Sequence, residues 1–128
     1  MKKDFERWHK KKEKLEEIEQ RPNFHEREIW FCYLGLNIGD EEDGKGDDCM
    51  RPIIIVRKFN NNIFWAIPTT RTKKEGVFYF KFHLEKKNGF AILSQIATLD
   101  GKRLGYKIGE ISKKDFFELK EKLKKLLP

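Results

Sequence analysis

The spacing of hydrophobic positions divides the chain into a helical, an extended and a second helical part. Over residues 3–20, apolar side chains recur three or seven positions apart among lysines and glutamates, which predicts an amphipathic helix that ends at Pro22. From Glu28, short aromatic and β-branched runs alternate with turn-forming residues, which is typical of strands. A helical spacing returns after Ser112. The pattern therefore predicts a helix, about six short strands and a second helix.

The extended part also indicates how its strands pair and which faces are buried. Asparagines at 60–62 and Lys-Asn-Gly at 87–89 favour tight turns. The run EIWFCYLGL from Glu28 is apolar on both faces, so we expect it to be covered twice, by the core and by a helix or a partner subunit. After FAILSQIATLD, the stretch GKRLGYKIGEI predicts a turn and one more short strand. In VFYFKFHL, alternation predicts a core face that comprises Phe78, Phe80, Phe82 and Leu84.

The last helix and the number of strands together predict the fold class. Ser112 is placed to cap this helix, and Asp115 suits the positive end of its dipole. Many short strands in so short a chain favour a strongly curved barrel of about five to seven strands over a sandwich. We expect a mainly β (α+β) fold, with a charged helix and linker over residues 1–26 and the barrel with its C-terminal helix over 27–128. The helix is expected to bury a stripe that comprises Phe116, Leu119, Leu123 and Leu127.

Composition and charge narrow the possible functions. The 128 residues carry a net charge of +7, and residues 51–128 hold 18 basic and 7 acidic side chains, which attracts polyanions such as nucleic acid or acidic partners and also aids solubility. No apolar run approaches the length of a membrane-spanning helix, and the charged start does not resemble a signal peptide, so we expect a cytoplasmic protein without membrane contact. Cys32, Cys49 and the three histidines have no metal-ligand spacing, so we expect no metal and no cofactor.

Three short segments carry the candidate chemistry. LNIGDEE at 36–42 leads through an acidic, glycine-containing loop to Arg51-Pro52, at the head of an apolar strand. IPTT at 67–70 ends the next strand, and LSQI at 93–96 is followed by Lys-Arg-Leu at 102–104. In this order and spacing the segments resemble the MazF/PemK family, the toxin half of bacterial toxin–antitoxin pairs, over about residues 27–127.

This resemblance implies a fold, an activity and partners. It implies an SH3-like barrel that forms a homodimer, cleaves single-stranded RNA without metal, and is silenced by an antitoxin protein. In such cleavage the 2′-OH attacks the adjacent phosphorus and leaves a 2′,3′-cyclic phosphate and a 5′-OH. The arginine and threonine of the family fall on Arg51 and Thr69, which the resemblance identifies as the catalytic residues.

The chemistry of the two side chains suits these roles. A guanidinium presents several donors in a fixed fork that matches phosphate oxygens. Because arginine stays protonated at neutral pH, Arg51 is interpreted as stabilising negative charge and not as a general base. Thr69 is expected to donate a hydrogen bond to a non-bridging oxygen, a contact worth about 3 kcal/mol. In a purely structural interpretation, Arg51 instead pairs with Glu41, and Thr69 satisfies the turn after Pro68.

Further residues are expected to bind RNA or to support this pair. Two aromatic positions could form a platform on which a base stacks: Tyr79 beside Lys81, and Phe59 beside Arg57 and Lys58. Gln95 could read a base edge, although tying strands together is the preferred interpretation. His25 and His83 are considered because histidine is a common acid–base residue, but both are expected to be solvated or capping. The predicted supporting set comprises Glu41, Thr70, Arg71, Lys73, Tyr79, Lys81 and Gln95.

The chain departs from the family pattern around the loop that precedes Arg51. Asp40 and Glu42 replace the serine and glutamine of the family, and Ser94 stands where one branch has a catalytic aspartate. RNA phosphates require positive potential, so we hypothesise that this acidic loop lies over the basic groove until RNA binds. The loop is longer than in the family and adds Asp43, Asp47 and Asp48.

The alternative function, from a different class, is a non-catalytic small-barrel module that binds nucleic acid or protein.

Overall fold

The computed structural model describes residues 22–34 and 50–128, which form seven antiparallel strands and one α-helix. The helix expected over residues 3–20 and the acidic loop lie outside the described residues. The predicted mainly β class with a C-terminal helix is confirmed. In chain order the elements are β1 (Glu28–Tyr33), β2 (Met50–Lys58), β3 (Ile63–Thr70), β4 (Tyr79–Leu84), β5 (Lys87–Ile92), η1 (Leu93–Gln95), β6 (Ala97–Asp100), η2 (Gly101–Arg103), β7 (Leu104–Glu110) and α2 (Lys113–Lys124).

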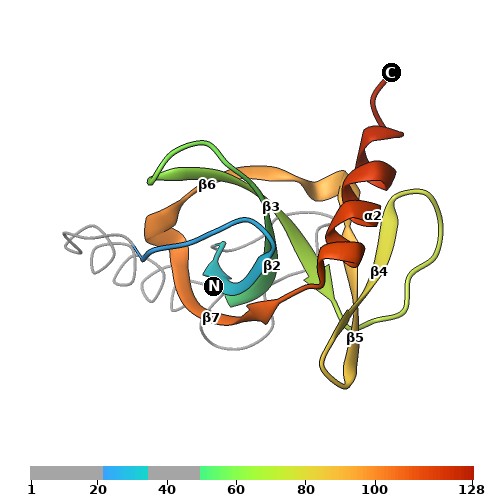
Figure 1. The fold of residues 1–128 in the computed structure, drawn as a ribbon, viewed down its shortest axis with the longest axis horizontal. Helices are drawn as coiled ribbons and strands as arrows, with labels where there is room; N and C mark the ends of the chain where they lie inside the picture. The colour runs from blue at the N-terminus through green and yellow to red at the C-terminus, as the bar shows by residue number, and fades with distance from the viewer. Residues whose placement is uncertain (1–21, 35–49) are drawn as a thin grey trace, which may run out of the picture.

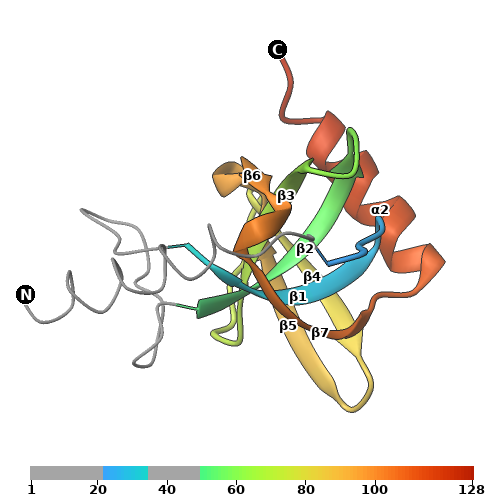
Figure 2. The same cartoon turned by 90° about the vertical axis from the view of Figure 1, so that its left-hand side faces the viewer.

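The sheet follows the order β4-β5-β3-β2-β1-β7, and β6 pairs with β3 outside this path. Strand β3 pairs with β6 over its first half and with β5 at Thr69 and Thr70, so the sheet bends along β3. This bend explains why FAILSQIATLD is not one strand: the chain leaves β5, turns through the 3-10 helix η1 and returns as β6 on the other half of β3. Figures 1 and 2 show the resulting curved sheet, with the end of β7 leading into α2, which packs beside β4.

Two hydrophobic clusters fill the two sides of the sheet. One includes Ile29, Ile54 and Ile67 beneath Phe116 and Leu119 of α2. The other includes Trp30 and Cys32 of β1 with residues of β2, β3 and β7. The first half of β1 is therefore buried on both faces, as its apolar sequence predicts, with α2 over the face of Ile29, whereas Phe31 and Tyr33 further along that face are half-buried.

Two residues of the predicted apolar stripes lie at the surface. Phe78 is 51% exposed because it precedes β4 and so does not share the alternation that buries Phe80 and Phe82. Leu127 is 73% exposed because α2 ends at Lys124, and Leu126 packs on the core in its place. Both assignments to the core were wrong because they extended a regular period past the end of an element.

The turn predicted at 87–89 is also wrong, because these residues belong to β5. The β4–β5 hairpin turns at Glu85 and Lys86, where Glu85 has a φ of 54°. Gly89 pairs with Phe82, and a Cβ atom at Gly89 would lie 2.4 Å from the Phe82 ring. The glycine therefore makes room for an aromatic ring across the strand. By contrast, the turn at 60–62 is confirmed, with Asn60 Oδ1 accepting from the backbone N–H of Asn62.

Side chains of α2 cover the outer edge of β4. Ser112 caps the helix as predicted, its Oγ accepting from the Asp115 N–H at 3.0 Å. The Asp115 carboxylate accepts in turn from the His83 N–H at 3.0 Å, and Lys122 Nζ donates to the Tyr79 carbonyl. The free edge of β4 is thus hydrogen-bonded to the helix. None of the helices in the described part of the chain has the length and apolar character needed to cross a bilayer.

A buried carboxylate joins β1 to β7. Glu28 accepts from the Trp30 Nε1 at 3.0 Å and from the backbone N–H of His25 at 2.7 Å, and Lys107 Nζ lies 3.0 Å away. Burial alone would raise the pKa of Glu28, but these hydrogen bonds and the charge of Lys107 outweigh it, so the pKa lies below its ordinary value. The ionised carboxylate is the form that the fold stabilises.

Replacing Glu28 by glutamine is expected to reduce the free energy of unfolding by about 1–3 kcal/mol at neutral pH, because Lys107 and Trp30 lose a charged acceptor. A lowered pKa means that the stabilisation is present above the unfolded-state value of 4.5 and is lost as the pH falls through the folded-state value. The difference between wild type and Glu28→Gln should therefore shrink below about pH 4.5. Urea unfolding from pH 3 to 7 measures it. A difference independent of pH would contradict the role of the charge.

Candidate active site

The structure brings the two predicted catalytic residues together. Arg51 begins β2 and Thr69 ends β3, and the Arg51 Nη2 donates to the Thr69 carbonyl at 3.2 Å across 18 residues of sequence. The Thr69 hydroxyl donates to the Pro52 carbonyl at 3.1 Å. Both residues are 5% exposed. A buried guanidinium is thus held against the end of β3 by the backbone.

These hydrogen bonds also give both residues a structural role. The hydroxyl of Thr69 uses its one donor on Pro52 and must turn away to donate to a substrate. The guanidinium has five N–H donors, of which the bond to Thr69 takes one. Glu41, predicted to orient Arg51, lies outside the described residues.

The loop that follows β3 places basic side chains directly beside this pair. Thr70 is half-buried, and its hydroxyl accepts from the Thr72 N–H at 3.2 Å. Arg71 and Lys73 are exposed, and Lys73 forms an ion pair with Glu75 at 3.3 Å. Such exposed cations create positive potential at the end of β3.

Strand β4 brings one further cation to the same end of the sheet. Lys81 of β4 pairs with Phe90 of β5, and Phe90 pairs with Thr70 of β3. Directly paired residues share a face, so the exposed Lys81 lies about 10 Å from Thr70, two strand spacings away. Tyr79 lies farther along β4, half-buried, with its carbonyl bonded to Lys122.

Gln95 lies in the 3-10 helix η1, which follows β5, and not in a strand. It is half-buried in the connection between β5 and β6, where η1 contacts β3 and β4. Its predicted role of tying strands together stays a prediction.

Arg103 is a supporting residue that the sequence analysis named only as part of a motif. Its Nη1 donates to the Tyr33 carbonyl at 3.1 Å and so fixes the end of β1. Its place in the Lys-Arg-Leu segment was the one sequence feature that pointed to Arg103. Its contact with Tyr33, 70 residues earlier, could not be predicted from residue spacing.

The remaining candidate nucleophiles and bases of the described residues are a cysteine and two histidines, and each is held by contacts of the fold. Cys32 pairs with Arg51 across β1 and β2, but burial raises the pKa of its thiol to about 12, so it stays protonated. His83 Nδ1 lies 3.3 Å from Asp115 Oδ2, and His25 Nδ1 lies 3.5 Å from Glu28 Oε2. Within residues 22–34 and 50–128, no group of three or more His, Cys, Asp or Glu side chains is arranged to hold a metal ion.

Solved structures share this fold. The chain is similar to MazF from Deinococcus radiodurans, with a TM-score of 0.65 and 18% identity over 84% of this chain and 97% of that chain. It is also similar to an endoribonuclease from a mycobacterial species solved in complex with its cognate antitoxin, with a TM-score of 0.63 and 19% identity over 84% and 97% of the two chains. The Mycobacterium tuberculosis toxin MazF-mt6 aligns with a TM-score of 0.58 and 17% identity over 77% and 94%. The fold is therefore that of the MazF toxins.

The sequence itself identifies the family. Residues 25–127 match the family model described as PemK-like, MazF-like toxin of type II toxin-antitoxin system. The chain therefore belongs to this toxin family. A comparison with curated proteins found no significant match.

Proposed function

We propose that this protein is the toxin of a type II toxin–antitoxin pair and an endoribonuclease that cleaves single-stranded RNA. The observation that carries the proposal is the contact between Arg51 and the Thr69 carbonyl, at the two positions that the motif resemblance assigns to the family's arginine and threonine. They lie together at one end of the sheet, beside the exposed Arg71 and Lys73. A positive site with a buried, oriented guanidinium suits a phosphodiester.

The proposed reaction uses the RNA's own 2′-OH as nucleophile. The 2′-oxygen forms a bond to phosphorus, the bond to the 5′-oxygen breaks, and a proton passes from the first oxygen to the second. Negative charge accumulates on the non-bridging oxygens in the transition state. Arg51 stabilises this charge with its fixed fork of donors, and Thr69 adds a hydrogen bond when its hydroxyl turns from Pro52.

Metal independence is the direct test of this mechanism. Purified protein incubated with a long transcript in EDTA is expected to cut at full rate, because neither the nucleophile nor Arg51 depends on an ion. The products should carry 2′,3′-cyclic phosphate and 5′-OH ends, which end-specific ligation and mass spectrometry identify. An identically purified Arg51→Ala protein controls for contaminating nuclease. Activity that is lost in EDTA and restored by magnesium would contradict the proposal.

A second function is favoured by the internal hydrogen bonds of the site. Because the Thr69 hydroxyl and one Arg51 donor are both used on backbone carbonyls, the two residues serve the fold even without a substrate. A non-catalytic module that binds RNA through its basic surface would retain them. Tight RNA binding without cleavage, under the conditions given above, would support this second function.

We further propose an antitoxin partner and a homodimer. The antitoxin is supported by the family and by the solved complex of a similar toxin with its cognate antitoxin.

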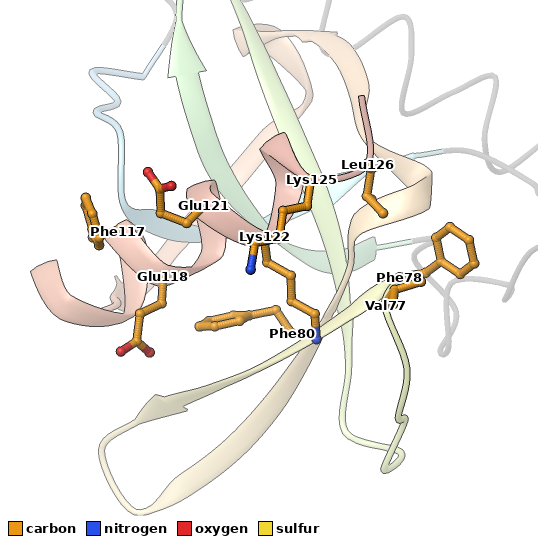
Figure 3. Close-up of a pocket in the computed structure, with 9 residues that line it drawn as sticks. All are labelled: Val77, Phe78, Phe80, Phe117, Glu118, Glu121, Lys122, Lys125 and Leu126. Atoms are coloured by element: carbon orange, nitrogen blue, oxygen red, sulfur yellow. The ribbon is translucent and has the colours of Figure 1, made fainter. Parts of the chain in front are cut away.

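The dimer is supported by an open apolar groove of about 780 Å³ between α2 and the start of β4. Figure 3 shows Phe80 at its floor and Phe117 and Phe78 at its two ends. Phe117 is 61% exposed.

The charges along the groove favour a second copy as its occupant. Glu118 and Glu121 come first along α2, and Lys122 and Lys125 follow on the same side of the helix (Figure 3). Two such helices in antiparallel contact place the acidic half of each against the basic half of the other. A two-fold interface requires this kind of self-complementarity.

A further inference from the structure

We infer that Tyr106 is a base-stacking residue that holds a nucleotide neighbouring the cleaved linkage, a role that rests on the proposed function. Tyr106 is 57% exposed in β7. Its ring lies 4.9 Å from the ring of Phe31, with an interplanar angle of 40°. An aromatic ring fixed at the surface offers a stacking face to any base.

The register of the sheet connects this ring to the candidate active site. Tyr106 pairs with Phe31, and Phe31 pairs with Pro52. The β2–β3 ladder pairs Ile53 with Pro68, so the next pair along the ladder is Pro52 with Thr69. The hydrogen bond from the Thr69 hydroxyl to the Pro52 carbonyl agrees with this register. Paired residues share a face, so these four side chains form one row across β7, β1, β2 and β3.

The length of this row fits RNA that lies across the strands. Three strand spacings separate Tyr106 from Thr69, about 14 Å. A base on Tyr106 therefore belongs to a nucleotide that neighbours the one at Thr69, the residue whose carbonyl Arg51 contacts. Phe31 and Pro52 are both half-buried, so they present an apolar surface to the RNA between Tyr106 and Thr69.

The charges around Tyr106 favour nucleic acid over an apolar partner. From Gly101 to Ile108 the chain carries three basic residues and no acidic one. Lys102 and Arg103 immediately precede β7, and Lys107 follows Tyr106. Exposed aromatic rings beside cations are the combination that binds single strands.

Binding to an RNA oligonucleotide that is 2′-O-methylated throughout tests this role without cleavage, because the oligonucleotide has no 2′-OH nucleophile. Its sequence spans a site that the wild type cuts, or is mixed where the wild type cuts none. Tyr106→Ala and Tyr106→Leu are expected to bind about tenfold more weakly, whereas Tyr106→Phe retains the affinity. Phe59→Ala is the matched control and should bind as wild type does, because this exposed ring follows the end of β2 opposite to Arg51 and packs edge-to-face on Trp65.

Removing single bases from the oligonucleotide locates the contact. One abasic position should weaken wild type about tenfold and leave Tyr106→Ala unaffected, because the stacking partner is already absent. Unchanged affinity of Tyr106→Ala, no coupled abasic position, or no RNA binding by wild type would each overturn the inference. If wild type cleaves RNA but the Tyr106 variants bind as wild type does, the stacking role is refuted and the proposed function stands. If RNA binding depends on Tyr106 but no cleavage occurs, the stacking role stands and the proposed endoribonuclease activity is refuted.

Discussion

Arg51→Ala is expected to lower the rate of RNA cleavage by at least about a hundredfold, because one preorganised donor to a developing oxyanion is worth a factor of this size. The guanidinium is buried and held at the Thr69 carbonyl, so water cannot replace it in the same geometry. Arg51→Lys keeps the charge but loses the planar fork, and should recover only a small part of the rate. Single-turnover cleavage of a short RNA measures the chemical step.

The same substitution also affects the fold, so the comparison needs a control. Arg51→Ala leaves the buried Thr69 carbonyl without this donor, which is expected to cost about 1–3 kcal/mol of stability. Rates must therefore be measured well below the melting temperature of each variant. Arg57→Ala removes an exposed arginine from the same strand and should leave both cleavage and stability nearly unchanged. Undiminished cleavage by folded Arg51→Ala would exclude Arg51 from catalysis.

The strands could be predicted from the sequence because each carries a local signal. Alternation in β4 predicts the burial of Phe80 and Phe82, and the Ser112 cap predicts where α2 begins. The ends of elements were predicted less well, because period alone does not show where it stops, as Phe78 and Leu127 illustrate. Asn88-Gly89 is a typical turn signal, but here the glycine lies inside β5, where the absence of a side chain leaves room for the ring of Phe82.

The residues of the site could be predicted, but their environment could not. The motifs point to Arg51 and Thr69 as separate strand ends, and only the antiparallel register places one against the carbonyl of the other. Burial of both side chains follows from the bend of the sheet at β3, which no local pattern encodes. The row from Tyr106 to Thr69 likewise depends on the order of four strands, so the sequence pointed to Tyr79 and Phe59 as stacking residues and not to Tyr106.

Replacing the exposed Phe117 by aspartate should convert a dimer into a monomer. In the proposed dimer this ring leaves water, and burying a large aromatic side chain contributes about 1.5–3 kcal/mol on each of two symmetric copies. Aspartate would instead place a charge in the interface, close to Glu118. Because Phe117 is exposed in the single chain, the monomer should keep its fold and melting temperature. Sedimentation velocity at several protein concentrations measures the change.

Charge reversal tests the antiparallel arrangement itself. In that arrangement position 118 of one copy lies near position 125 of the other. Glu118→Lys alone and Lys125→Glu alone should each weaken the dimer, because each places like charges opposite one another. Mixing the two variants should restore it, because every facing pair then has opposite signs, whereas Lys114→Glu, outside the groove, should have no effect. Single variants that dimerise as wild type does, or a mixture that stays monomeric while each single variant is weakened, would show that the two helices do not meet in this way.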